Sequence, residues 1–176
     1  GAHPELDVAR LTAVRQAIGN DTRIRIDANQ GWEPKQAVRL LNQMQEKGLD
    51  IEFVEQPVKA HDIDGLKYVT ERSYVPVLAD ESVFSPEDAV RIMQTRAADL
   101  VNIKLMKCGG LYPAEQINAL AQANGLTCMV GCMMATKLSS TAGLSFVEAK
   151  TNGHEEDQDS FKEYAGGETN CHGRIN

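Results

Sequence analysis

Short apolar runs rich in β-branched residues alternate along this chain with longer segments in which apolar residues recur at helical spacing. The apolar runs predict five strands, at residues 23–28, 51–55, 75–80, 99–106 and 126–133. The longer segments predict helices at residues 5–18, 33–48 and 62–72, a helix opened by Ser85, and helices at residues 113–123 and 136–150. The predicted order is therefore one helix followed by five strand–helix units.

Strict alternation of strands and helices predicts an α/β fold with a parallel sheet and right-handed crossovers. Two closures fit this order, a doubly wound open sheet and part of a (β/α)8 TIM-type barrel. No GxGxxG motif follows the first predicted strand, which argues against a dinucleotide site. A complete barrel of this kind needs about 250 residues, so five units predict a partial barrel over residues 1–150.

Residues 151–176 break the pattern. They are polar, acidic and rich in Gly and Asn, with almost no apolar periodicity. This composition predicts a loop-rich or disordered tail.

The composition narrows the classes of function. The 176 residues are 42% hydrophobic and carry a net charge of −7, which permits a buried core and argues against a nucleic-acid partner. No apolar run approaches the roughly 18 residues of a membrane span, so no membrane partner is expected. The four cysteines show no CxxC spacing and are typical of reduced thiols in a cytoplasmic protein.

The most informative residues close the first four predicted strands or lie near their ends: Asp27, Glu55, Asp80 and Lys104. They follow one another at intervals of about 24 to 28 residues, which is close to one strand plus one helix. Because the carboxyl ends of consecutive parallel strands share one edge of the sheet, these side chains are expected to converge. Each acid taken alone is equally typical of a helix N-cap or a surface charge, so the argument depends on all three having the same strand phase.

Three carboxylates on neighbouring strand ends repel one another unless a cation lies among them. Oxygen ligands with open positions suit Mg²⁺, and Mn²⁺ is the obvious substitute. Asn29, two residues beyond Asp27, is placed to orient a ligand or to bind a water on the metal.

Lys104 lies within an apolar run, where a lysine whose stem covers apolar surface is the ordinary interpretation. Beside a divalent cation in a desolvated pocket its pKa is expected to fall, which would make it a general base or acid. Lys107 is expected in the following loop, exposed to solvent, as a second candidate for substrate contact. Together these groups suit removal of a proton alpha to a carboxylate, through an enediolate that a metal stabilises.

Four motifs around these positions resemble the enolase superfamily: RIDANQGW (25–32), EFVEQP (52–57), LADESVFS (78–85) and VNIKLMKCGG (101–110). Within the superfamily the chain is most similar to the muconate-lactonizing-enzyme subgroup, and there to the dipeptide epimerases. The resemblance implies that Asp27, Glu55 and Asp80 bind Mg²⁺ and that Lys104 is a catalytic acid/base. It also implies an isomerase acting on a small carboxylate or dipeptide, most simply epimerisation of the L-Ala-D/L-Glu type.

GCMM (131–134) resembles the next strand end of that family, so Cys132 and Met133 are expected to line the substrate pocket. Two alternatives stay open. One is another reaction of the subgroup, such as o-succinylbenzoate synthesis or cycloisomerisation. The other is a non-catalytic barrel fragment that serves as a binding or assembly module, with a homo-oligomer covering the open sheet edges.

Three family features have no counterpart in these 176 residues: the Lys-x-Lys strand before the first metal ligand, the capping domain, and an Asp-x-Asp on the last strand. In addition, Ala135 stands where the family has Glu. Inversion of a stereocentre needs an acid/base on each face, and Lys104 supplies one face. The isolated chain is therefore expected to have epimerase activity far below that of an intact family member.

Overall fold

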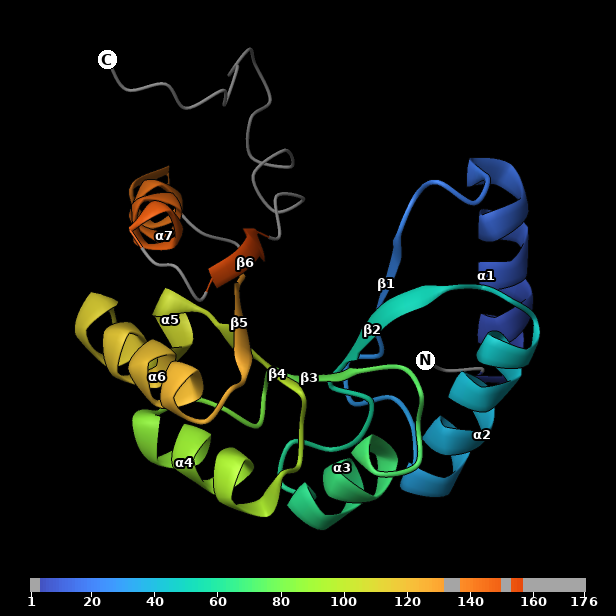
Figure 1. Ribbon diagram of the computed structural model, residues 1–176, viewed down its shortest axis with the longest axis horizontal. Helices are drawn as coiled ribbons and strands as arrows, with labels where there is room; N and C mark the ends of the chain where they lie inside the picture. Colours follow the sequence, from blue (N-terminus) through green and yellow to red (C-terminus); the bar gives the residue numbers. More distant parts are fainter. Residues whose placement is uncertain (1–3, 132–136, 150–152, 157–176) are drawn as a thin grey trace.

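The computed structural model describes residues 4–131, 137–149 and 153–156, which form one sheet with helices packed against it (Figure 1). The strands are β1 (Ile24–Asp27), β2 (Ile51–Glu55), β3 (Val77–Ala79), β4 (Leu100–Ile103), β5 (Thr127–Val130) and β6 (Gly153–Glu156). The helices are α1 (Pro4–Ile18), α2 (Pro34–Glu46), α3 (Ile63–Thr70), α4 (Pro86–Thr95), α5 (Leu105–Cys108), α6 (Leu111–Ala123) and α7 (Lys137–Glu148).

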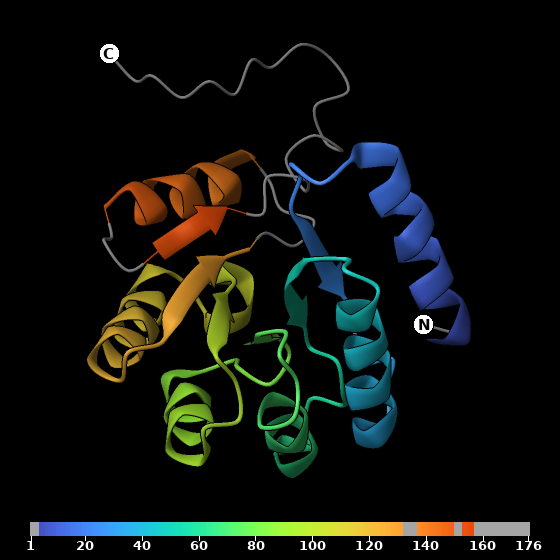
Figure 2. The same ribbon diagram turned by 45° about the vertical axis from the view of Figure 1, so that its right-hand side comes forward.

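The strand order in the sheet is the same as the order in the chain, β1 to β6, and every pair is parallel. A doubly wound sheet would reverse this order at a switch point and carry helices on both faces. Here the strands curl and the helices surround their outer side (Figure 2). The prediction of a partial TIM-type barrel is confirmed, and the doubly wound alternative is wrong.

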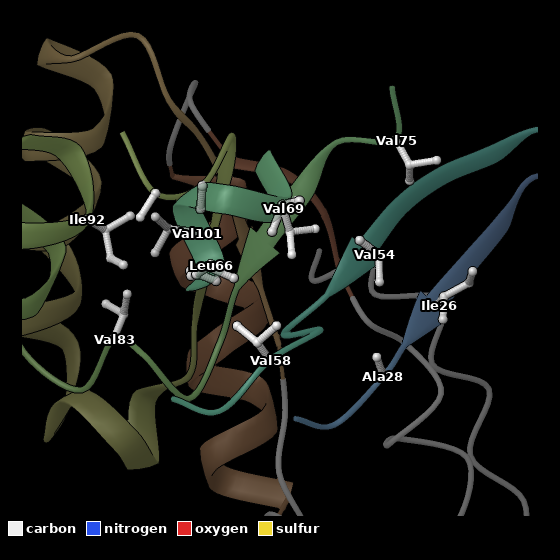
Figure 3. Packing of buried hydrophobic residues seen from close by; sticks show 14 of the residues in the cluster. Ile26, Ala28, Val54, Val58, Leu66, Val69, Val75, Val83, Ile92 and Val101 are labelled. Carbon is white, nitrogen blue, oxygen red and sulfur yellow. The ribbon is translucent and has the colours of Figure 1, made fainter. Parts of the chain in front are cut away.

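The main core lies between the outer side of the sheet and the helices. Val54 and Val101 extend from the strands towards helical residues such as Leu66, Val69 and Ile92, all of them almost fully buried (Figure 3). Close packing of this layer supplies most of the hydrophobic stabilisation and fixes each strand against its own helix.

A second, smaller cluster consists of Phe53, Leu78 and Met129, with Leu100 packed against it. Because strand side chains alternate between faces, these residues share a face with the residues two positions further on, at the carboxyl ends of β2 to β5. The small cluster therefore forms an apolar base beneath the strand ends that carry the candidate chemistry.

The helices begin and end at conventional signals. In α4, for example, Pro86 is the first residue, and the Ser85 hydroxyl accepts a hydrogen bond from the Asp88 amide at 3.2 Å. The helix ends at Arg96, whose left-handed φ of 53° turns the chain towards β4. Such signals explain why the predicted helices agree with the observed ones to within a few residues.

Two predictions differ from the structure in the kind of element that forms. The predicted strand 99–106 ends at Ile103, because the chain turns at Lys104 into the one-turn helix α5. Residues 153–156, predicted to belong to a loop-rich tail, pair with β5 as β6. For residues 157–176 the tail prediction lies outside the described residues, as do Cys132 and Met133.

Two partner predictions concern the surface of the fold. Among the described residues, none of the helices has both the length and the apolar composition that a membrane span requires. Among the described strands, β1 and β6 each pair on one side only. Whether a second copy covers these edges stays a prediction.

Candidate metal and proton-transfer site

Three carboxylates gather at the carboxyl end of the sheet, as the strand phase predicts. Asp27 and Glu55 are the last residues of β1 and β2 and lie opposite each other in the parallel register. Asp80 follows the last residue of β3 directly and is 4% exposed. Parallel pairing thus brings together residues that are distant in the chain.

Asp27 is the most exposed of the three carboxylates and is held by Asn29. Its two oxygens accept hydrogen bonds from the Asn29 backbone amide and side-chain Nδ2, each at 2.8 Å. Asn29 has a positive φ of 49°, which turns both donors back towards Asp27. Partial burial raises the pKa of Asp27, and the charges of Glu81 and Asp80 add to the shift against these donors. Asn29 therefore orients Asp27 in this structure.

Glu55 is buried at the end of β2, and its carboxylate accepts a hydrogen bond from a side chain of β4. The side-chain Nδ2 of Asn102, a fully buried residue of β4, donates to Glu55 Oε1 at 2.8 Å. The Lys104 ammonium lies 3.6 Å from the same oxygen. Burial and the charge of Asp80 nevertheless raise the pKa of Glu55 to about 7. The Asn102 amide and the Lys104 ammonium therefore do not fully offset the cost of burying the Glu55 charge beside Asp80.

Asp80 lies between two ammonium groups. Lys104 Nζ donates to Asp80 Oδ2 at 2.5 Å, and Lys107 Nζ contacts Oδ1 and also the Asp80 carbonyl oxygen. Burial alone would raise the pKa of Asp80, but the two lysines, Lys107 foremost, hold it below its usual value. Asp80 is therefore ionised and links the two lysines to the strand ends.

The prediction that Lys107 is exposed is wrong, since 4% of its side chain is accessible. The single turn of α5 directs Lys107 back over Asp80, where it also donates to the Asn102 carbonyl oxygen at 3.3 Å. Burial lowers the pKa of Lys107 despite the neighbouring carboxylate.

The predicted fall in the pKa of Lys104 depends on a neighbouring divalent cation, and the protein groups alone shift this pKa in the other direction. Burial alone would lower it, but the hydrogen bond and the charge of Asp80, together with the charge of Glu55, raise the pKa above the ordinary value. Lys104 is thus a charged ammonium group here, and it can accept a proton only where other positive charge offsets these carboxylates.

Two residues of the site were not predicted. Asn102 fixes Glu55, and Gly131, directly after β5, leaves the space that Asn102 and Lys104 occupy. A Cβ atom at Gly131 would lie 2.6 Å from Asn102 Oδ1 and 2.9 Å from Lys104 Cε. Asn102 could have been found from its position two residues before Lys104, on the same face of the strand.

In the described residues no three Asp, Glu, His or Cys side chains are close enough together to hold one metal ion. The Asp27 carboxylate is hydrogen-bonded to Asn29, and the Asp80 carboxylate is hydrogen-bonded to the two lysines. The chemistry of the donor set still fits a divalent cation, because three hard oxygen donors occupy adjacent strand ends. Two of them, Asp27 and Glu55, have raised pKa values to which neighbouring negative charge contributes. The site therefore has the donors for a cation and an excess of negative charge.

The fold and the site together define a partial barrel of the TIM type with three carboxylates and two largely buried lysine side chains at its carboxyl end. The chain belongs to the enolase C-terminal domain-like family, whose model matches residues 1–173.

Curated relatives support the same assignment. The chain is 55% identical over 150 residues to the L-Ala-D/L-Glu epimerase of Clostridium acetobutylicum, covering 85% of this chain and 42% of the relative. It is 52% identical over 146 residues to the enzyme of the same name from Bacillus subtilis, covering 83% of this chain and 40% of that enzyme. The chain thus spans about two fifths of the length of these relatives.

Solved structures agree with both fold and family. The substrate-liganded L-Ala-D/L-Glu epimerase from Bacillus subtilis is similar with a TM-score of 0.88 and 50% identity, over 89% of this chain and 44% of that chain. The dipeptide epimerase of Enterococcus faecalis, in complex with Mg and the dipeptide L-Leu-L-Tyr, has a TM-score of 0.88 and 42% identity, over 91% of this chain and 45% of that chain.

Proposed function

We propose that this chain carries the metal and proton-transfer half of a Mg²⁺-dependent dipeptide epimerase, acting on dipeptides of the L-Ala-D/L-Glu type. The observation that carries the proposal is the position of the Lys104 ammonium, 2.5 Å from Asp80 and 3.6 Å from Glu55 at the carboxyl end of the sheet. A basic group held beside carboxylates that can bind a metal is what abstraction of a proton alpha to a carboxylate requires.

Each residue has a proposed role. Asp27, Glu55 and Asp80 hold the cation, with Asn29 orienting the first of them, and Mn²⁺ is accepted in place of Mg²⁺. When bound, the cation supplies positive charge that offsets the developing negative charge on the substrate carboxylate.

Lys104 moves the α-proton, and Lys107 acts through its contact with Asp80. Positive charge shared among the carboxylates would weaken their hold on the Lys104 ammonium and lower its pKa towards the range of a general base. The apolar cluster of Phe53, Leu78 and Met129 lies beneath the strand ends and gives the site an apolar base.

The test is exchange of the substrate α-proton in D2O, followed by NMR, with Mg²⁺ and L-Ala-L-Glu, a hydrophobic dipeptide or N-succinyl-L-arginine. N-succinyl-L-arginine is included because an N-succinyl-L-Arg/Lys racemase from Bacillus cereus is 40% identical over 151 residues. We expect exchange to be fastest with L-Ala-L-Glu, because relatives that are 55% and 52% identical are L-Ala-D/L-Glu epimerases.

Lys104→Met is expected to lower exchange by about 10²- to 10⁴-fold, the usual contribution of a general acid or base. The matched control is Lys67→Met, which removes an exposed lysine of α3 whose partner is Glu71 at 3.8 Å. Equal exchange in the Lys104→Met and parent chains would contradict the role of Lys104. Exchange that persists at full rate in excess EDTA would contradict the metal.

A further inference from the structure

Gln56, the residue after the second carboxylate, is fully buried, and its side chain uses all of its hydrogen-bonding capacity. Its Oε1 accepts from the backbone amides of Asp80 at 2.9 Å and Ser82 at 3.1 Å. Its Nε2 donates to Ser82 Oγ at 2.8 Å and to the Val58 carbonyl oxygen at 3.1 Å. Three of these four bonds join the end of β2 to the segment that carries the third carboxylate.

The backbone of Gln56 makes two further connections. Its amide donates to the Leu78 carbonyl oxygen of β3 at 2.9 Å, and its carbonyl oxygen accepts from the Gln30 amide at 2.7 Å. Gln56 therefore touches the loops after β1, β2 and β3, which follow the three carboxylates. It thus links the three segments that must keep their places if the carboxylates are to share one ligand.

Gln56 also has a backbone conformation that residues other than glycine rarely adopt. Its φ of 35° is in the left-handed region, although it is not glycine and precedes Pro57. Strained backbone of this kind persists where the surroundings dictate it, and it is concentrated at functional sites. Here it directs the side chain into the loop network rather than towards the carboxylates.

We propose that Gln56 is a positioning residue that sets the separation of Glu55 and Asp80 for binding a divalent cation. The two carboxylates repel each other, and the side chain of Gln56 holds the Asp80 and Ser82 amides at a fixed place relative to the end of β2. Ser82 extends the network, since its hydroxyl donates to the Ala60 carbonyl oxygen at 2.9 Å. This inference rests on the metal site of the proposed function and adds a residue that touches neither metal nor substrate.

The test is Mn²⁺ binding to the full chain, measured by electron paramagnetic resonance with circular dichroism confirming the fold. Gln56→Met keeps the length of the side chain and removes all four hydrogen bonds. It is expected to weaken Mn²⁺ binding at least about 10-fold, as loss of an outer support of a metal ligand does. Gln56→Glu keeps an acceptor for the Asp80 and Ser82 amides and is expected to recover part of the affinity.

The matched control is Thr70→Val, which removes the hydroxyl that donates to the Ala97 carbonyl oxygen at 2.7 Å, at the amino end of the sheet. It is expected to lower thermal stability while Mn²⁺ binding stays within twofold of the parent. If Gln56→Met does not fold, Ser82→Ala takes its place and is expected to weaken binding about threefold, a smaller part of the usual loss for an outer support.

Parent-like affinity in folded Gln56→Met, or in Ser82→Ala where that variant replaces it, would overturn the inference. So would an equal loss of affinity in Thr70→Val, because the effect would then be general destabilisation. Asp80→Asn separates this failure from that of the proposed function. If Asp80→Asn loses Mn²⁺ and Gln56→Met does not, only the role of Gln56 is wrong, whereas parent-like binding in Asp80→Asn removes the metal site itself.

Discussion

The two ends of the sheet differ in how their buried charged groups are stabilised. At the amino end, Arg15 of α1 is 7% exposed, and its guanidinium group is surrounded by backbone carbonyl oxygens. It donates to Leu49 twice, at 3.1 and 2.8 Å, and once each to Gly19, Thr22 and Asp50. At the carboxyl end, three carboxylates share two ammonium groups, and Glu55 has a pKa of about 7. At the amino end the buried charge is fully hydrogen-bonded. At the carboxyl end the negative charges outnumber the positive ones.

The contrast separates a residue that stabilises the fold from the residues that are proposed to bind the metal and move the proton. A guanidinium group with five hydrogen bonds fixes the start of the sheet and needs no further partner. A cluster of like charges destabilises the chain unless a ligand completes it, which is the pattern of a binding or catalytic centre. Variants at the two ends should therefore differ in sign as well as in size.

The largest effect is expected at the amino end. Arg15→Met removes the donors of five hydrogen bonds and should lower the free energy of unfolding by about 3 kcal/mol, measured by urea denaturation. Arg10→Met is the control, because Arg10 lies on the same helix with 63% of its side chain exposed. Metal affinity should not change in either variant. A loss of Mn²⁺ binding in folded Arg15→Met would show that the two ends are not independent.

The next effect, that of Glu55→Gln, is a gain in stability instead of a loss. The pKa of Glu55 is raised from 4.5 to about 7 in the folded chain, so between these pH values the unfolded chain releases a proton that the folded chain keeps. The contribution of this group to stability is thus complete below pH 4.5 and is lost as the pH rises through 7. Without metal, Glu55→Gln should therefore be more stable than the parent at pH 8, by up to about 3 kcal/mol, and equal to it at pH 4.

This measurement is thermal unfolding in EDTA as a function of pH. In excess Mg²⁺ the order should reverse, because the side-chain amide that the variant carries is a poorer ligand than a carboxylate. A variant that is less stable than the parent at pH 8 in EDTA would show that Glu55 is already compensated by Asn102 and Lys104.

A smaller effect is expected where the site meets β5. Gly131→Ala brings a Cβ atom to 2.6 Å from Asn102 Oδ1 and 2.9 Å from Lys104 Cε, and should cost about 1 to 2 kcal/mol. It should also slow α-proton exchange, because Lys104 is displaced. Gly143→Ala in α7 is the control, since the nearest atom to its Cβ is Val130 Cγ1 at 4.0 Å. Exchange at the parent rate in Gly131→Ala would contradict the close packing around Lys104.

The smallest effect is expected at Glu52, on the same strand as Glu55 but nearer the amino end. Burial alone would raise the pKa of Glu52, but its hydrogen bonds to Arg25 at 2.8 Å and Arg23 at 2.6 Å lower it. Its contribution to stability is thus present above the ordinary pKa of 4.5 and is lost as the pH falls below it. Glu52→Gln should cost no more than about 0.5 kcal/mol at pH 7 and nothing at pH 2, in urea titrations. A larger cost would show that the ion pairs of Glu52 stabilise the fold more than solvent-exposed ion pairs usually do.

The sequence predicts the repeating strand–helix order well because each strand is apolar and each helix begins with a local signal such as Ser85-Pro86. It also predicts which residues reach the carboxyl end, since Asp27 and Glu55 close apolar runs. The burial of Lys107 could not be predicted in this way, because it depends on the turn of α5 at Lys104. Nor could the proposed role of Gln56, since three of its side-chain hydrogen bonds reach residues that are 24 or 26 positions away.

The sequential order of the strands has a consequence for how the chain acquires its shape during synthesis. Each strand from β2 onward pairs first with the strand made just before it, so no described strand waits for a distant partner. Connections of this kind keep the loops that must close short, which favours rapid formation of local structure. Each strand–helix unit can therefore add to the growing sheet as it leaves the ribosome, and the acidic end is completed only when β4 supplies Asn102 and the lysines that follow it.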